Sequence, residues 1–573
     1  MKNTAFRLRP VAASVAVLAL LTSCASLLPF MPDPNARAPV LHGYGQIHIP
    51  ITTSSPRAQE LFNQGVLQAY AFNEVEAVRI FKAALAQDSG CAMCAWGVAW
   101  QLGPNINNSD RDNNAEALQY VGYALKRLDH ATPRERALVE SLALRYGHSS
   151  VARETAPLMA DMCGKGAQDE DDEKAHPLDV AYAQRMRTLA DRYPQDADIL
   201  SLYAEAEIIS TEGPVMWQKS GQPVGRIGEV ADRLERALAL HPDHTGLNHY
   251  LIHVADALPV ASRAVAAADK LGRLAPQSPH LVHMPAHTFV HVGRYAEAAR
   301  VNERALEADA TLAATEKAQD FSVSKDWRGH NTHFLWYAAL MAGREDAALT
   351  AARAMALRAA AAKNIMGEYV RSLPLITLVR MENWEAALAE PQAPGDKGLA
   401  KAWMEYAHGI AQVRLGRMDE ARQSLAHLQE VAATTRKAND GKSGMHRNVR
   451  SMLDMAQSGL EAEVALADKR FDDAEKLQAQ AMAASVKVDA REPPLLADGT
   501  RVALGGLQAR AGRWPQAEAT YRQALAEHPG SGWALRGLAT SLSAQGKAAE
   551  AAAVRAELSK SWSEASPNLR DRV

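Results

Sequence analysis

The sequence predicts an all-α protein built as a long array of helical hairpins. Alanine-rich amphipathic stretches follow one another from about residue 56 onward, a short turn motif recurs between them, and alternating β patterns are almost absent. The only candidate for a strand is GQIHIPIT at residues 45–52. With 573 residues, of which 47% are hydrophobic, the chain can bury an extended core.

The recurring motif combines a turn residue, a basic or polar residue, and the acidic and alanine-rich start of a helix. Its copies are FNEVEA (72–77), GRYAEA (293–298), GREDAA (343–348), ENWEAA (382–387), GRMDEA (416–421), KRFDDA (469–474), GRWPQA (512–517) and GKAAEA (546–551). Glycine tolerates the left-handed conformation that often ends a helix, so the motif predicts a chain reversal. Single hairpins cannot bury their own apolar face and must therefore stack.

The spacing of the last two motifs is typical of a known repeat. Gly512 and Gly546 are 34 positions apart, with YRQALAEHP and WALRGLATSLSAQG between them. This unit resembles the tetratricopeptide repeat, which implies an α-solenoid. Earlier motifs are 50, 39, about 34 and about 53 positions apart, so we expect the middle of the array to be degenerate.

The first residues are typical of a bacterial secretory signal peptide. Basic side chains precede an apolar run from Val11 to Leu21, and the run ends in LTSC at residues 21–24. This ending resembles a lipobox, which implies lipidation of Cys24 and a membrane anchor that does not span the bilayer. Ala25 after the cysteine is typical of lipoproteins sent to the outer membrane. We therefore expect a periplasmic body anchored to the outer membrane, with surface exposure left open.

Proline-rich and acidic stretches predict the boundaries between segments. DAREPPLLADGT (489–500) ends a helical pattern, LLPFMPDPNARAPV is typical of a tether, and GKGAQDEDDEKAHP (164–177) is typical of a solvated loop. The expected organisation is a signal peptide (1–23), a lipidated tether (24–55), an N-terminal array with a histidine-rich groove (56–350), middle repeats (351–488) and C-terminal repeats (501–565).

Charge and motif content exclude two classes of partner. The net charge is −3 and basic residues are mixed with acidic ones, so no electrostatic footprint for nucleic acid is present in the sequence. No phosphate-binding glycine loop, dinucleotide fingerprint or nucleophile elbow occurs either. We therefore expect neither nucleic acid nor nucleotide as a ligand.

The cysteines after the signal peptide favour a structural role. Cys91 and Cys94 form a CxxC, and Cys163 stands alone. A tetrahedral metal site needs four ligands, and the sequence offers no second pair. We expect simple burial or a disulfide, formed either within the CxxC or with Cys163.

Histidine is concentrated in one part of the chain. Ten of the 19 histidines lie between positions 241 and 333. They are His241, His244, His249, His253, His280, His283, His287, His291, His330 and His333. Six of them form three pairs spaced three or four positions apart, which places both members of a pair on one helix face. The pairs are His249 with His253, His283 with His287, and His330 with His333.

Paired histidines on neighbouring helices predict a metal centre. Two imidazoles one turn apart can bind the same ion, and stacked helices can bring several pairs together. We expect the six paired histidines to form one site of four to six ligands or two adjacent sites, for copper, zinc or iron. Asp256 and Asn331 are expected to support these ligands from outside.

The stretch HLVHMPAHTFVHVG (280–293) contains a proline that limits its helix. A helix begins either at Pro279 or at Pro285, because proline is tolerated only in a first turn. The expected ligands are therefore His283 and His287, whereas His280 and His291 are expected outside the ligand set. Upstream, Glu205 lies in an otherwise apolar helix, as a structural ion-pair partner, an oxygen ligand or a general base.

Several segments together resemble one family of bacterial, often exported, tetratricopeptide-repeat proteins. They are LFNQGVLQAYAFNEVEAVRIFKAAL, CAMCAWGVAWQLGPN, LYAEAE, HTGLNHYLIHVADA, HLVHMPAHTFVHVGRYAEA and HNTHFLWYAALMAGR, within about residues 56 to 350. The resemblance implies an α-solenoid and includes the histidine pairs, but it implies no activity. This chain has His291 where the sequence pattern of the family has arginine, and Asp256 where that pattern has glutamate.

Two functions follow from these patterns. The first is a metal-dependent enzyme, hydrolytic or oxidative, in which the paired histidines hold the ion. The second is a non-catalytic scaffold that binds a peptide or protein partner in the groove of the array, with the histidines hydrogen-bonded as structural groups.

Overall fold

The computed structural model describes residues 30–107, 111–148, 175–211, 215–323, 326–391, 398–441, 443–488, 493–496 and 499–570. Within these ranges the chain is helical and has no strand, so the all-α prediction is confirmed. The signal peptide, Cys24, Cys163 and most of the acidic loop lie outside the described residues.

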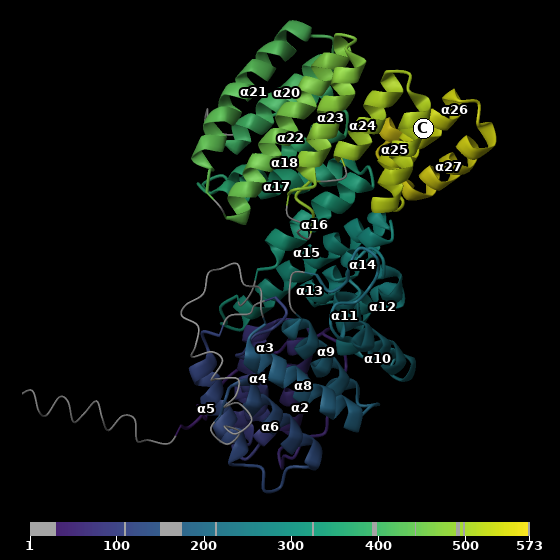
Figure 1. Ribbon diagram of the computed structural model, residues 1–573. Helices are drawn as coiled ribbons and strands as arrows, with labels where there is room; N and C mark the ends of the chain where they lie inside the picture. Colours follow the sequence, from purple (N-terminus) through teal and green to yellow (C-terminus); the bar gives the residue numbers. More distant parts are fainter. Residues whose placement is uncertain are drawn as a thin grey trace, which may run out of the picture.

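The helices form an array of antiparallel hairpins that runs from one end of the molecule to the other (Figure 1). The first part contains α2 (Pro56–Tyr70), α3 (Glu74–Gln87), α4 (Ala92–Gln101), α5 (Asn114–Leu125), α6 (Pro133–Arg145), α8 (Pro177–Arg192), α9 (Ala197–Ser210), α10 (Ile227–Leu240), α11 (Thr245–Val254), η3 (Ala261–Ala264), α12 (Val265–Leu274), α13 (Pro279–His283) and α14 (Pro285–His291).

The second part continues with α15 (Tyr295–Ala318), α16 (Arg328–Met341), α17 (Glu345–Arg358), α18 (Ile365–Arg380), α19 (Trp384–Ala389), α20 (Leu399–Arg414), α21 (Met418–Ala438), α22 (Gly444–Ala467) and α23 (Phe471–Ser485). The last part holds α24 (Gly499–Arg510), α25 (Trp514–Glu527), α26 (Gly532–Ala544), α27 (Ala548–Ser561) and α28 (Pro567–Arg570). The predicted break at residues 489–500 therefore falls between α23 and α24.

Every copy of the turn motif begins with a left-handed residue and opens a helix two positions later. The helices are α3, α15, α17, α19, α21, α23, α25 and α27, and the φ angles of the first residues lie between 50° and 79°. Five of these residues are glycine, for which the conformation is not strained. The others are Phe72, Glu382 and Lys469, with φ of 50°, 58° and 62°, where a side chain carries a cost.

The segment before α2 differs from the expected tether and from the candidate strand. Tyr44 and Ile49 are buried against the helices, and the Gln277 amide donates to the Gly43 carbonyl at 3.0 Å. Residues 45–52 pair with side chains of α2: the Ile49 amide donates to Asn63 Oδ1 at 3.2 Å. Side chains of a helix thus accept the backbone hydrogen bonds that a neighbouring strand would accept in a sheet.

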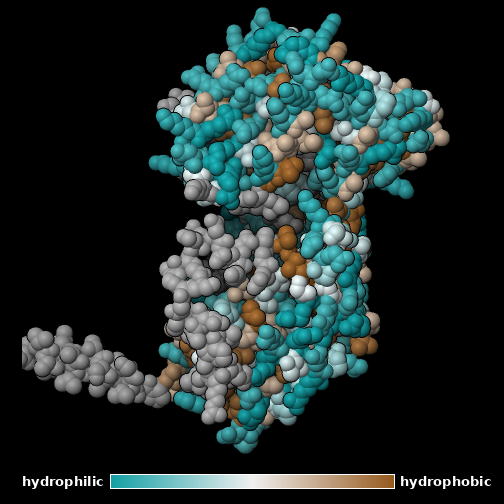
Figure 2. Space-filling model, in the orientation of Figure 1, coloured by the Kyte–Doolittle hydropathy of each residue, from teal (hydrophilic) through white to brown (hydrophobic). Residues whose placement is uncertain are grey.

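A large apolar core cluster extends along the array, with smaller clusters in the middle and C-terminal repeats, because each hairpin covers the face of the next. The described helices include none with the length and apolar character that a bilayer span requires. Hydrophilic side chains dominate the described surface on the face shown in Figure 2.

The C-terminal repeats fold back onto the middle of the array. Trp533 and Trp562, from α26 and the end of α27, donate their indole N–H to the carbonyls of Leu340 and Met341 at 3.0 and 3.2 Å. The amide of Ser566 also donates to the Gly343 carbonyl at 2.9 Å. The helices from α16 to α27 therefore form an arc whose end meets its beginning (Figure 1).

The strained turn at Lys469 yields a stability prediction. We expect Lys469→Gly to raise the free energy of unfolding by about 1 kcal/mol, because glycine removes the left-handed strain at an exposed position. The matched control is Lys476→Gly, at an exposed position inside α23, which should lower it by about 1 kcal/mol. Urea denaturation of both variants measures the difference, and a destabilised Lys469→Gly protein would contradict the assignment.

Candidate metal centre

Helix α11 places two histidines side by side in the core. All ten residues of α11 are buried, and His249 and His253 lie one turn apart on the same face. Their Nε2 atoms are 3.0 Å apart. A third imidazole, His280 from α13, brings its Nε2 to 3.1 Å from that of His249. We call His249, His253 and His280 triad A.

The prolines shape the next helix pair without ending it. α13 begins at Pro279 and α14 at Pro285, so both of the starts weighed from the sequence are used. Met284 between them has φ −49° and ψ −36°, an ordinary right-handed helical conformation. The helical path therefore continues through residues 279–291, and His280 and His283 both turn inward.

A second cluster forms from α13, α14 and α16. The Nε2 atom of His283 lies 3.1 Å from that of His287 and 3.1 Å from that of His330. We call His283, His287 and His330 triad B. In each triad one ligand atom from every residue lies within 4.8 Å of the others.

Two of the sequence assignments need correction. His280, expected outside the ligand set, belongs to triad A, because the helix starts early enough to place it over α11. His333, expected to pair with His330, instead lies 3.1 Å from the Tyr369 hydroxyl through its Nε2. Residues three apart on a helix diverge by about 60°, and here that angle separates the two rings.

Hydrogen bonds at Nδ1 determine the tautomers in triad B. Asn302 donates its Nδ2 to the Ala298 carbonyl at 2.8 Å, so its Oδ1 faces His283 Nδ1 at 2.7 Å. An amide oxygen only accepts, so His283 carries its proton on Nδ1. His287 Nδ1 likewise lies 2.8 Å from Asp256 Oδ2, which accepts that proton. In their neutral forms, His283 and His287 therefore carry their ring lone pairs on Nε2.

Asp256, expected to support the ligands from outside, lies just past the end of α11 and contacts His287 of α14. It holds His287 from outside, and its other oxygen lies 3.3 Å from His291 Nε2. The charges and hydrogen bonds of His287 and His291 hold the pKa of the Asp256 carboxyl well below its usual range, despite burial. Asn302 likewise accepts the Nδ1 proton of His283. It lies on α15, 19 residues further along the chain, and no sequence motif predicted this contact.

Asn331 does not form the hydrogen bond to a ligand histidine that the sequence led us to expect. Asn331 is fully buried on α16, and its two amide atoms have no hydrogen-bond partner among the described residues. The structure thus places it beside His330 without a bond to any histidine of the triads.

Aromatic rings surround the imidazoles and keep them in the core. Phe72 stacks on His253 and His280, with ring centroids 5.4 and 5.0 Å away. Trp327 stacks on the other side of His280 at 4.4 Å, and Phe334 lies 4.6 Å from His287. Phe72 is the only aromatic first residue of a turn motif, and its strained backbone places a ring on triad A where glycine would leave a gap.

Burial favours the neutral form of four of the triad imidazoles. Desolvation lowers the pKa of His253 and of His330 to about 3, and it holds the pKa of His249 and of His283 well below the ordinary value. Neutral imidazole is the form that binds a metal ion.

The Nε2 separations match those of ligands around one ion. Nitrogen atoms at about 2.0 to 2.1 Å from a metal are separated by about 3.3 Å in a tetrahedral site and about 2.9 Å in an octahedral one. The observed separations of 3.0 and 3.1 Å lie between these values. In each triad, two of the three ligand separations thus fit adjacent positions around one ion, and the third lies within 4.8 Å.

A cavity of about 1060 Å³ lies beside both triads. Its wall contains His253, Asp256, His280, His287 and His330 on one side. Polar side chains from the first helices form the other side, namely Glu74, Arg79, Lys82, Gln101, Asn105 and Asp112. A polar molecule could thus approach both triads at once.

Glu205 lies away from this cavity. It does not line the wall, and Trp100 donates its indole N–H to Glu205 Oε2 at 2.9 Å. Burial raises the pKa of Glu205, while the charge of Arg145 and the hydrogen bonds from Trp100 and Tyr250 oppose the shift. These contacts support the structural interpretation of Glu205 rather than the role of a ligand or base.

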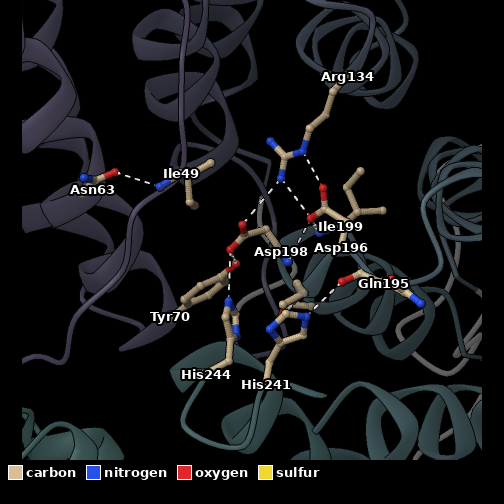
Figure 3. A network of polar contacts seen from close by, with 12 residues as sticks. Ile49, Asn63, Tyr70, Arg134, Gln195, Asp196, Asp198, Ile199, His241 and His244 are labelled. Carbon is tan, nitrogen blue, oxygen red and sulfur yellow. Dashed lines mark hydrogen bonds and ion pairs between the residues drawn. The ribbon is translucent and has the colours of Figure 1, made fainter. Parts of the chain in front are cut away.

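The histidines that precede α11 have structural partners instead (Figure 3). His244 caps α11 by accepting from the Leu247 amide, and its Nε2 lies 3.1 Å from Asp198 Oδ1. His241 Nε2 lies 3.1 Å from the Gln195 carbonyl oxygen. Arg134 and Tyr70 complete this network around Asp198. The number of histidines in this region is therefore larger than the number that could serve as ligands.

The CxxC forms a disulfide between Cys91 and Cys94 at the start of α4. Both sulfurs are buried, which agrees with the structural role expected from the sequence. Pairing within the motif removes both thiolates from any metal site.

The comparisons with known proteins identify repeats and no activity. Residues 508–561 match the family described as tetratricopeptide repeat, so this segment carries the repeat expected there. No curated protein sequence matches the chain.

Three solved structures of low identity resemble it. Yeast Tom70 is 14% identical, with 90% of this chain and 93% of that one covered and a TM-score of 0.21. The Cut9–Hcn1 hetero-tetramer of the APC/C is 10% identical, with 90% and 96% covered and a TM-score of 0.24. A human IFIT1 dimer with m7Gppp-AAAA is 11% identical, with 89% and 96% covered and a TM-score of 0.28. Because these TM-scores are low, the description of the architecture given above rests on the structure of this chain and not on these similarities.

The burial of His333 predicts an acid-sensitive fold. Desolvation lowers the pKa of His333 to about 4, below its ordinary value of about 6.5. The unfolded chain therefore binds the proton first, and the stability contributed by neutral His333 is complete above about pH 6.5 and is lost as the pH falls toward 4.

We expect His333→Gln to flatten the fall of the melting temperature between pH 6.5 and 4 in chelator-treated protein. The exposed His427 provides the control, because His427→Gln should leave the fall unchanged. Thermal denaturation across this pH range measures both slopes, and equal slopes for wild type and His333→Gln would contradict the assignment.

Proposed function

We propose that this protein is a metalloprotein in which triad A and triad B each bind one transition-metal ion. The observation that carries the proposal is the convergence of three Nε2 atoms in the core: that of His283 lies 3.1 Å from that of His287 and 3.1 Å from that of His330. Burial lowers the pKa of His283, so a proton on the central ring is disfavoured. A metal ion satisfies these nitrogens without charging the rings.

The two triads lie next to each other, which supports a pair of ions in one centre. His280 of triad A and His283 of triad B are neighbours on α13, with ring centroids 6.3 Å apart. Of the two arrangements expected from the sequence, two adjacent sites fit this geometry better than one site of six ligands. An all-imidazole ligand set favours copper, zinc or iron.

The geometry favours a metal-dependent enzyme, hydrolytic or oxidative. Three histidines leave open positions on an ion, and the cavity of about 1060 Å³ gives a substrate access to them. An ion with an open position activates a bound water or oxygen molecule. The chain itself contributes the orientation of His287 through Asp256 and of His283 through Asn302, and aromatic walls that limit water.

We also propose that the body is periplasmic and anchored to the outer membrane through a lipid on Cys24. The N-terminal sequence, which resembles a signal peptide, and the cysteine at its end support this location. The disulfide between Cys91 and Cys94 is independent support, because such bonds persist in oxidising compartments.

A second candidate function is that of a scaffold for a protein partner. The match of residues 508–561 to the tetratricopeptide repeat favours it, since such arrays commonly bind other proteins. In that case the triads would be hydrogen-bonded structural groups and the protein would not need a metal ion.

Metal analysis separates the two functions. We expect protein purified without an affinity tag, and reconstituted with copper or zinc, to hold about two equivalents. His249→Ala should remove about one equivalent and His253→Ala/His287→Ala nearly both, because each triad then loses a ligand. The double variant His130→Ala/His427→Ala, at exposed positions, is the matched control. Elemental analysis and circular dichroism follow content and fold.

Two results would count against the metal centre. One is wild-type protein that holds less than about 0.2 equivalents of any transition metal after reconstitution. The other is a folded His253→Ala/His287→Ala protein with full metal content, which would place the ions elsewhere.

Asp256 provides a finer prediction. Asp256→Asn should weaken metal binding at triad B by roughly 10- to 100-fold, because the amide no longer holds the Nδ1 proton of His287 as firmly. Asp198→Asn changes a carboxylate that holds His244, outside both triads, and should leave metal affinity unchanged. Competition with a chromogenic chelator measures both affinities, and equal values for the two variants would refute the role of Asp256.

A further inference from the structure

A second cavity lies inside the C-terminal arc, away from the triads. Its volume is about 360 Å³, and α18, α20, α22, α24 and α26 contribute much of its wall. These are the first helices of successive hairpins, and their side chains face this common space.

The wall of this cavity carries an excess of positive charge. It contains four arginines, Arg380, Arg414, Arg510 and Arg536, but only two carboxylates, Glu382 and Glu463. Arg414 and Arg510 share Glu463 at 3.1 and 2.6 Å, and Arg536 pairs with Glu382. The formal charge of the wall is therefore positive by two, although the rest of the chain is mildly acidic.

Aromatic side chains line the space between these charges. Trp403, Tyr406, Tyr521 and Trp533 all belong to the wall. Trp403 is 3% exposed, and its indole N–H has no acceptor among the described residues. A buried donor of this kind costs free energy unless an acceptor atom reaches it. Arg380 lies over the Trp533 ring, 4.5 Å from its centroid, so a cation and an apolar surface meet at one point.

The closure of the arc limits the size of what can bind. The hydrogen bonds of Trp533 and Trp562 to the carbonyls of α16 close the arc at its side. A long peptide that runs along an open groove, as expected for a scaffold, does not fit such a closed surface. The volume of about 360 Å³ is instead in the range of small-molecule pockets.

We propose that this cavity binds a small organic anion with an apolar body, an apolar carboxylate. Its carboxylate meets the arginine side of the wall, and its body packs between the tryptophan and tyrosine rings. This site is independent of the metal centre, because none of its wall residues belongs to either triad.

The test uses the full chain and the fluorescent anion 8-anilinonaphthalene-1-sulfonate as probe. We expect saturable binding of one probe molecule, displaced by decanoate at least about tenfold more strongly than by the uncharged 1-decanol. Arg380→Gln should weaken the displacement by decanoate about tenfold and leave that by 1-decanol unchanged. Arg417→Gln, at an exposed position outside the wall, is the matched control.

A second variant locates the probe without changing charge. Ala503 lines the cavity and is only partly buried, so Ala503→Trp should fill the space and abolish probe binding. His249→Ala should leave probe binding unchanged, which separates this result from the metal analysis. Equal displacement by decanoate and 1-decanol, or unchanged binding in a folded Ala503→Trp protein, would overturn the proposal.

Discussion

Each helical hairpin in this chain has an apolar face that only its neighbours can cover. This constraint produces the extended core and makes the turns between helices the points on which the array depends. The left-handed residue at the head of each motif reverses the chain within a few residues. At Phe72 a side chain stands where most copies of the motif have glycine. The left-handed backbone is unfavourable there, and the ring packs on the histidines of triad A.

Stacking also explains how polar groups come to be buried together. Helices that pack face to face bring together side chains that are far apart in the sequence, and His249 and His280 meet although 31 positions separate them. A buried imidazole needs partners for both nitrogens. In triad B, Asn302 and Asp256 accept the Nδ1 protons of His283 and His287, which in the neutral rings places the lone pairs on Nε2. The chemistry of the site follows from this arrangement of hydrogen bonds more than from the number of histidines.

The two cavities use the same architecture in different ways. The first lies where α11, α13, α14 and α16 approach α3 and α4, and it combines neutral ligands with a polar wall. The second lies within the C-terminal arc and combines fixed positive charge with aromatic surface. The histidine triads and the arginine-lined cavity therefore share no residue.

The sequence by itself determined the helical class, the positions of the chain reversals and the region where the histidines cluster. These features are local: turn chemistry and spacing on one helix face are readable from a few consecutive residues. His249, His253, His283 and His287 were identified in this way, as was the place of Asp256 near them.

Only the tertiary structure decided which histidines meet. The partition into two triads, the inclusion of His280, the exclusion of His333 and the role of Asn302 all depend on how α13 continues past Pro285 and how α15 and α16 pack against it. The closure of the C-terminal arc likewise depends on contacts between Trp533 or Trp562 and α16, about 200 positions apart. Such contacts are set by the summed packing of many helices, and no local pattern in the sequence encodes them.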